Sequence, residues 1–173
     1  CGIDCRGVTF AGDVNGDGFD DIIIGANYAD ANGENSGASY VIFGKASGFD
    51  ATVELSSLDG NNGFRLEGAV AGDYSGRSVS TAGDFNGDGF ADLIIGAFGA
   101  EPNGQDSGSS YLVYGKASGF SASLNLADLG SSDGILLNGL AAGDSLGKSV
   151  SSAGDVNNDG FDDLIIGAPF GDG

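Results

Sequence analysis

The chain has 173 residues, about the length of one domain, and 40% of them are hydrophobic, which is enough for a core. Its formal net charge is −19 with only six Lys and Arg residues. This composition excludes nucleic-acid binding through a basic surface, because the phosphates require positive side chains. No apolar run approaches the roughly 20 residues of a membrane-spanning helix.

The predicted elements repeat along the chain as one unit. An alternating segment comes first, followed by an acidic loop, a continuous apolar run, an aromatic and β-branched segment, and a weaker fourth strand. Before the fourth strand, 52–60 and 123–131 fit only a short turn of helix or an irregular connection. The expected strands are 6–13, 21–26, 38–44 and 63–68, then 77–84, 92–97, 109–115 and 134–139, and finally 148–155 and 163–168.

The acidic loops set the length of the repeat. Asp13, Asp84 and Asp155 each open a loop and are 71 residues apart. The chain therefore holds about 2.4 copies of the unit (173/71). By this period we divide it into a first unit at 1–60, a second at 61–131 and a partial third at 132–173.

Glycine content decides the fold class. Glycine occupies 34 of the 173 positions, and no stretch without it is long enough for a sustained amphipathic helix. Four short strands with a face that one unit cannot bury alone predict an all-β fold built of propeller blades, each with four antiparallel strands. About 2.4 blades make a partial propeller. We therefore expect the segment to self-associate, or to belong to a larger assembly or a longer polypeptide.

Each acidic loop carries side-chain oxygens at positions one, three, five and nine, which are Asp, Asn, Asp and Asp. Such hard oxygens are the ligands that Ca²⁺ prefers, and the backbone carbonyl at position seven adds another. Three carboxylates in one loop repel one another without a cation, so we expect three Ca²⁺ ions, one per loop. The predicted ligands are Asp13, Asn15, Asp17, Phe19, Asp21, Asp84, Asn86, Asp88, Phe90, Asp92, Asp155, Asn157, Asp159, Phe161 and Asp163.

The loop differs from an EF-hand at position twelve. An EF-hand needs a bidentate Glu there and a helix on either side, whereas Ile24, Ile95 and Ile166 occupy the position here, inside a predicted strand. The loop is therefore expected in a β-hairpin, with left-handed backbone at positions four and six. Plain Asn-Gly and Asp-Gly hairpin turns are the alternative. They account for "NGDG" but not for the acids at positions one and nine.

The sequence "GRSVSTAGDFNGDGFADLIIGA" from Gly76, followed by "SGSSYLVYG", resembles the FG-GAP repeat of integrin α-chain propellers and bacterial extracellular proteins. "GAP" at 167–169 matches outright, and Leu146 with Gly147 stands where that family has Phe-Gly. The pattern departs at Ser75, which precedes Gly76, and at "GAN" and "GAF" in the first two copies. The resemblance implies a seven-bladed propeller in the full protein, with calcium loops on one face and an extracellular or cell-surface location.

These features predict a calcium-stabilised extracellular β-propeller module for adhesion or structural protein–protein interaction. No catalysis is expected, because the chain lacks His and a Cys-centred dyad. The expected partners are other blades of the same or a neighbouring chain and an extracellular protein or glycan ligand. A glycan-binding module is the alternative function. Its candidate stacking residues, which are equally candidates for packing between blades, are Tyr40, Phe43, Tyr111 and Tyr114.

Three further groups of residues carry two interpretations each. The periodic Arg6, Arg77 and Lys148 either bind an acidic ligand or neutralise nearby carboxylates. The loops that vary between copies, which hold Glu34, Glu101 and Asp106, either recognise a partner or form solvated turns. Cys1 and Cys5 are too few for a disulfide scaffold, and they either bridge locally or stay free.

Overall fold

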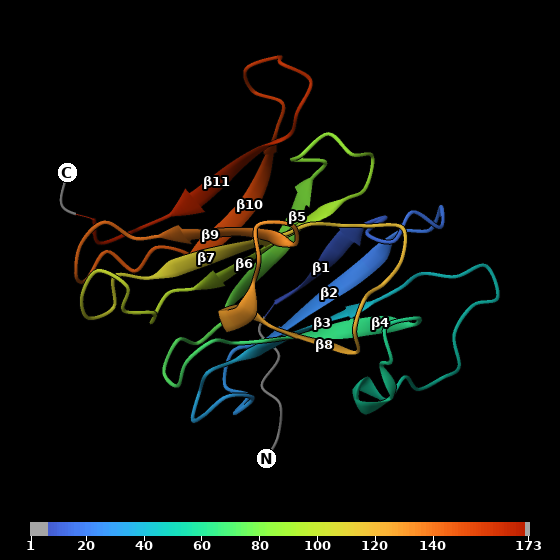
Figure 1. Cartoon of the computed structure of the whole chain (residues 1–173), viewed down its shortest axis with the longest axis horizontal. Helices are drawn as coiled ribbons and strands as arrows, with labels where there is room; N and C mark the ends of the chain where they lie inside the picture. The colour runs from blue at the N-terminus through green and yellow to red at the C-terminus, as the bar shows by residue number, and fades with distance from the viewer. Residues whose placement is uncertain (1–6, 172–173) are drawn as a thin grey trace.

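The computed structural model describes residues 7–171, which form three β-sheets (Figure 1). The first sheet has the strand order β1-β2-β3-β4-β8, the second has the order β5-β6-β7-β9, and the third is the hairpin β10-β11. The strands are β1 (Gly7–Gly12), β2 (Asp21–Ala26), β3 (Ala38–Ile42), β4 (Gly63–Glu67), β5 (Ser78–Gly83), β6 (Asp92–Ala97), β7 (Ser109–Val113), β8 (Ser123–Asn125), β9 (Gly134–Asn138), β10 (Ser149–Gly154) and β11 (Asp163–Gly167). Cys1, Cys5 and Arg6 lie outside the described residues.

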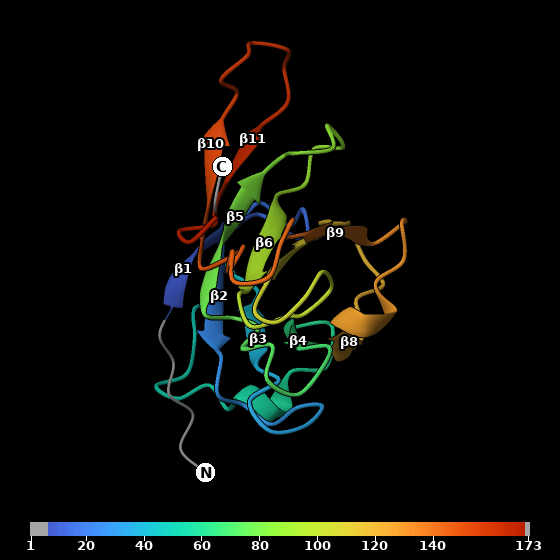
Figure 2. The ribbon, with the colours of Figure 1, turned by 90° about the vertical axis from the view of Figure 1, so that its left-hand side faces the viewer.

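The predicted all-β class is confirmed. Helical structure within 7–171 is limited to two 3₁₀ turns, η1 (Leu55–Ser57) and η2 (Leu126–Asp128), where the sequence predicted a short turn or an irregular connection. Each of the first two sheets contains four antiparallel strands in chain order, and the sheets do not close into a ring. The first strands of the three sheets, β1, β5 and β10, pack side by side (Figure 2). This arrangement is that of a partial propeller.

In the two complete blades, the core is deepest at the second strand. All six residues of β6 are buried, and Leu93, Ile94 and Ile95 have no exposed surface. Such a strand is covered on both faces, which explains why its sequence is a continuous apolar run instead of an alternation. Apolar residues of the first two sheets form one shared cluster, so that the blades bury each other's faces.

The aromatic residues that were candidates for sugar stacking belong to the interior. Tyr40, Phe43 and Tyr111 are at most 8% exposed, and Tyr114 is partly buried against a cluster that includes Ile94. Packing is therefore the role that the structure gives them.

The sheets extend past the boundaries expected from the 71-residue period. β4 follows residue 60 but pairs with β3, and β9 follows residue 131 but pairs with β7. The units 1–60, 61–131 and 132–173 count repeats along the chain, whereas each complete sheet takes its outer strand from just beyond the end of its unit.

One connection was not predicted from the sequence. After β7 the chain crosses to the first blade, where β8 pairs in parallel with β4. We call this crossing segment, residues 116–125, the second arm, and its equivalent 71 residues earlier, residues 45–54, the first arm. Phe120 of the second arm stacks on Phe64 of β4 with ring centroids 4.7 Å apart, and it lies 5.3 Å from Phe43. The second arm thus fastens one blade to the outer edge of the other.

This packing distinguishes Phe120 from its repeat equivalent, Phe49, which is 52% exposed. Phe120→Ala is expected to lower the free energy of unfolding by about 1–3 kcal/mol, because it removes a ring packed between two others. Phe49→Ala is expected to change it by less than about 0.5 kcal/mol. Urea denaturation of both variants provides the measurement. Equal losses would contradict the role given to the second arm.

Candidate metal-binding loops

The three acidic loops all connect the first and second strands of a blade, and they lie along one edge of the structure (Figure 1). Hydrogen bonds from backbone N–H groups join neighbouring loops. The N–H of Ala91 donates to the carbonyl of Asp13 over 3.0 Å, and the N–H of Asp84 donates to the Asp162 carboxylate over 2.9 Å. The predicted hairpin location is therefore confirmed, and the loops are stacked from blade to blade.

A glycine ends the first strand before each loop. At Gly12, Gly83 and Gly154 the strand register shifts and φ is between 66° and 77°. This is a β-bulge, which bends the chain out of the sheet. The bulge places the next residue, the position-one Asp, outside the strand ladder.

The position-one carboxylate organises the backbone of its own loop. Asp13 accepts hydrogen bonds from the N–H groups of Gly16, Asp17 and Gly18 at 2.7–3.0 Å. The second and third loops repeat the contacts to the residues at positions five and six. Positions four and six have the predicted left-handed backbone, including Asn158 at φ 61°. An aspartate capping its own turn in this way is a short-range motif.

Positions three and five face each other. Asn15 accepts from the N–H of Asp17 at 3.0 Å, and its side-chain amide donates to the Asp17 carboxylate at 3.1 Å. The other oxygen of Asp17 accepts from the N–H of Phe19. The same three contacts recur in both later loops.

The position-nine aspartate has a structural role that sequence reasoning missed. Asp92 has no exposed surface, and its two oxygens accept from the N–H groups of Gly115 at 2.9 Å and Phe85 at 3.1 Å. Asp21 makes the equivalent pair of contacts in the first blade. One carboxylate thus ties the loop, the second strand and the end of the third strand together. The contact to Gly115 joins residues far apart in sequence, so no local pattern reveals it.

Burial controls the ionisation of these two carboxyls. Desolvation raises the pKa of Asp21 and of Asp92 from 3.8 to about 6, although the backbone hydrogen bonds work in the opposite direction. The neighbouring acids, Asp17 and Asp13 in the first loop and Asp88 in the second, raise the pKa further. Negative charge is therefore concentrated where it is poorly solvated.

The position-seven phenylalanine was predicted only to offer its carbonyl. In the structure its ring also rests on the preceding loop, where a Cβ added to Gly16 would lie 2.4 Å from the Phe90 ring. Phe161 lies on Gly87 in the same way, with a corresponding distance of 2.3 Å. Glycine at position four is therefore required both by its backbone conformation and by the ring above it. The sequence signal was the pairing of that glycine with an aromatic residue 74 positions later.

The side-chain oxygens of each acidic loop are of the type that a hard cation binds. They do not converge on one common point in this structure. Among residues 7–171, no three Asp, Glu, His or Cys side chains are grouped closely enough to hold a metal ion. Each carboxylate offers about four acceptor positions. Asp17 and Asp21 each accept two hydrogen bonds, which leaves lone pairs on both.

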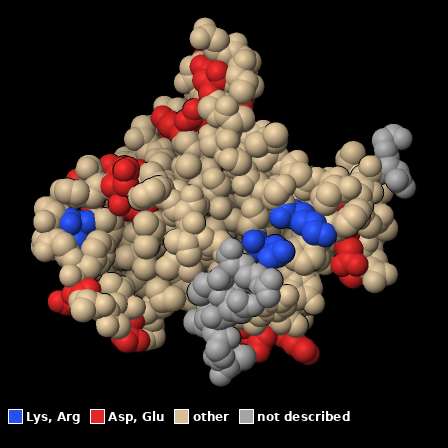
Figure 3. Space-filling model, turned by 180° about the vertical axis from the view of Figure 1, so that it is seen from behind, with Lys and Arg blue, Asp and Glu red and all other residues tan. Residues whose placement is uncertain are grey.

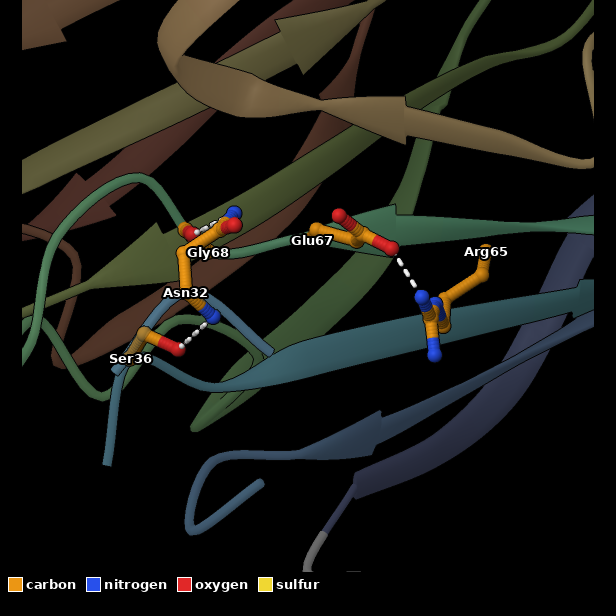
Figure 4. Close-up of polar contacts among 5 residues, drawn as sticks. All are labelled: Asn32, Ser36, Arg65, Glu67 and Gly68. Atoms are coloured by element: carbon orange, nitrogen blue, oxygen red, sulfur yellow. Dashed lines mark hydrogen bonds and ion pairs between the residues drawn. The ribbon is translucent and has the colours of Figure 1, made fainter. Parts of the chain in front are cut away.

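The variable loops lie on the other side of the blades from the acidic loops, and one anchor recurs in them. Asn32 donates from its side chain to the carbonyl of Gly68 at 2.9 Å, and its backbone N–H donates to Ser36 (Figure 4). Asn103 makes the equivalent contacts in the second blade. Beside this anchor, Arg65 and Glu67 form an ion pair on β4 (Figure 4).

A surface cavity of about 600 Å³ opens beside the second variable loop. Its lining includes the exposed acids Glu101 and Asp106, the ring of Tyr74 and the nearly buried Asp73. Burial raises the pKa of Asp73, and burial together with the charge of Asp73 raises the pKa of Tyr111 to about 12. The cavity is therefore acidic with an aromatic wall.

The periodic basic residue of the third unit packs against aromatic rings. Lys148 lies over the ring of Phe170 at 4.4 Å and near the ring of Phe98 at 5.8 Å, which is cation–π geometry. Seen from behind, the molecule shows acidic side chains in separate groups around a broad uncharged area (Figure 3). Exposed apolar residues on β1, Val8 and Phe10, are 66% and 73% exposed.

Comparison with known proteins agrees with this architecture. A relative covering 94% of the chain is integrin alpha-4 of Xenopus laevis, 30% identical over 163 residues that make up 14% of it. Integrin alpha-5 of Xenopus laevis is 35% identical over 68% of the chain, and phosphatidylinositol-glycan-specific phospholipase D of Bos taurus is 32% identical over 93%. These segments are 11% and 18% of the two relatives, so the chain spans only a small part of the curated proteins it matches.

Within 7–171, no helix has the length and hydrophobicity of a membrane span. The model of the FG-GAP repeat matches residues 7–42, 75–113 and 147–173, which include all three acidic loops and more than half of the chain. The chain therefore belongs to the FG-GAP repeat family.

Proposed function

We propose that the chain is a calcium-stabilised β-propeller module that acts in adhesion or structural protein–protein interaction outside the cell. The observation that carries the calcium assignment is the buried position-nine aspartate, Asp21 or Asp92, whose pKa is raised by burial and by the charge of further carboxylates of the same loop. A cation offsets the repulsion and the desolvation that these groups otherwise impose on the folded state. Integrin α relatives support the interaction role.

The ligands proposed in the first loop are the side chains of Asp13, Asn15, Asp17 and Asp21 and the carbonyl of Phe19. The equivalent residues serve in the second and third loops. When bound, Ca²⁺ supplies positive charge and a common point for these oxygens. The protein's own contribution is to hold the loop backbone in place, through the amide hydrogen bonds to Asp13 and Asp21, before the ion arrives.

The interaction surface that we propose is the variable loop at 98–108 with the adjacent acidic cavity. Asn103 fastens that loop to Ser107 and Gly139, while Glu101 and Asp106 stay exposed. We propose no catalytic role for the chain. The glycan alternative loses three of its proposed stacking residues, because Tyr40, Phe43 and Tyr111 are buried in the core.

Calcium is expected to raise the melting temperature. An ion that binds only the folded state stabilises it by about 2.7 kcal/mol at a concentration 100 times its dissociation constant. Thermal melts of the protein in millimolar calcium, in excess chelator and in magnesium test this. Melting temperatures that are the same in all three conditions would exclude a stabilising calcium site.

The second loop permits a test of the ligand assignment with matched charge. Asp88→Asn removes a proposed ligand charge but keeps an oxygen to accept from Phe90, and Asp106→Asn removes one charge from the variable loop. We expect Asp88→Asn to abolish one of three calcium-binding events, or to weaken it at least about tenfold, in calorimetric titration. Asp106→Asn should leave all three intact. A similar loss in both variants would refute the assignment.

The buried carboxyls predict an unusual pH dependence in calcium-free protein. Because Asp21 and Asp92 titrate at about 6 when folded and near 3.8 when unfolded, the folded state holds their protons more tightly. Stability should therefore rise as pH falls from 7 to 5. Asp59 and Asp133, whose pKa values are lowered, act in the opposite direction only below this window.

Urea denaturation at pH 7, 6 and 5 measures the slope. Asp92→Asn should make the slope shallower whatever its effect on absolute stability, since it removes one of the titrating groups. A free energy of unfolding that falls over this range in calcium-free wild-type protein would contradict the prediction. In saturating calcium the rise should disappear, because protons then compete with the ion.

A further inference from the structure

The contact between the second arm and the first blade provides a template for an interface. β8 adds a parallel strand to β4, with Arg65 opposite Ser123, Leu66 opposite Leu124 and Glu67 opposite Asn125. The N–H of Arg65 points away from β3 and donates to the carbonyl of Ala122 at 2.9 Å. Phe120 covers Phe64 next to this strand pair. The interface therefore combines strand addition with one aromatic anchor.

An equivalent arm and an equivalent outer strand occur without such a partner strand within 7–171. The first arm lies 71 residues before the second arm, and β9 lies 71 residues after β4. The first arm has the sequence of the second at its anchor, "KASGF", but residues 52–54 form no strand and Phe49 is 52% exposed. At the other end of the molecule, β9 is the equivalent of β4 and is the last strand of its sheet. Within 7–171 no strand pairs with its outer edge, and Ile135 and Leu136 are 38% and 47% exposed.

We propose that the outer edge of β9 is a docking site for the arm of a further FG-GAP blade, which adds to it as a parallel strand. In this register the N–H of Leu136, the equivalent of Arg65, donates to the arm carbonyl that corresponds to Ala122. Ile135, the equivalent of Phe64, receives the arm's phenylalanine. The occupant is thus a segment of the type Gly-Phe-x-Ala followed by Ser or Thr and then Leu or Val. The acidic loops take no part in this contact, which is therefore independent of calcium binding.

A whole second copy of the chain does not fit this site by the native packing of blades. The hairpin β10-β11 already packs beside β5, in the place that the first sheet of a second copy would have to take. The arm segment alone meets no such obstacle.

One difference between the two edges limits the contact to β9 itself. A Cβ on Gly60 would lie 2.2 Å from the carbonyl of Phe120, so the loop before β4 touches the second arm. The equivalent residue is Ser131, in a turn where the N–H groups of Asp133 and Gly134 donate to Gly130. This turn has a different shape, and the strand pairing and the Ile135 contact carry the interface.

The experiment adds a fluorescein-labelled peptide of residues 116–129 to the intact chain and follows fluorescence anisotropy. That peptide contains the second arm, which the structure already shows docked on the equivalent edge of β4. Leu136→Pro removes the outward N–H donor while leaving the bonds to β7, because proline is tolerated on the free side of an edge strand. Leu136→Ala keeps the donor and serves as its control. Ile135→Gln tests the aromatic contact without changing the backbone.

We expect saturable binding to wild type and to Leu136→Ala, and binding at least about tenfold weaker to Leu136→Pro and to Ile135→Gln. A peptide with Phe120→Ala should lose at least as much. Thermal melts establish that each variant is folded, and if Leu136→Pro fails this check, Ile135→Gln and the Phe120→Ala peptide decide. No saturable binding up to about 1 mM peptide, the upper limit of a weak specific contact, would overturn the proposal. Equal binding by wild type and Ile135→Gln would overturn it as well.

Discussion

The dependence of each blade on its neighbours for burial underlies the structure. After their first residue, an aspartate, the central strands β2 and β6 contain only apolar residues and glycine, and a four-stranded sheet by itself leaves both of its faces in water. The apolar cluster that includes Ile23, Leu66 and Leu93 draws residues from both blades, and Phe120 and Leu124 of the second arm pack against it. At about 25 cal/mol per Å² of apolar surface, this shared burial is the main favourable term. The hydrogen bonds between loops and the second arm then connect blades that this shared burial holds together.

The polar architecture follows from the same geometry. The end of a buried strand leaves backbone N–H groups that need hydrogen-bond acceptors. In each complete blade, the buried aspartate at the start of the second strand accepts hydrogen bonds from two such groups. That carboxylate secures three segments at once, but it does so at the cost of holding negative charge in a poorly solvated place. In a chain of net charge −19, the same residue that completes the hydrogen bonding of the fold also carries a carboxyl group whose pKa is raised by burial.

The sequence was informative where structure is local and periodic. Strand positions, the all-β class and the left-handed glycines could be predicted because alternation, apolar runs and turn residues act over a few residues and were repeated three times. The arm β8 could not, since "SLN" pairs with β4 only after the blades are packed, and its equivalent "TVE" forms no strand. Likewise, the contact of Asp92 with Gly115 and the ring of Phe90 on Gly16 join residues 23 and 74 positions apart. Such contacts depend on how the blades pack in three dimensions, and a single sequence does not reveal that packing.

The loop ring contacts have a consequence for the order of blades. Gly16 and Gly87 each accept a phenylalanine from the blade that follows, because they have no Cβ. The third loop has Asn158 at this position, with left-handed backbone but with a side chain in the volume that the ring occupies in the other two. A ring at position seven of a following blade, if placed as Phe90 and Phe161 are, would therefore meet the Cβ of Asn158 in the third loop.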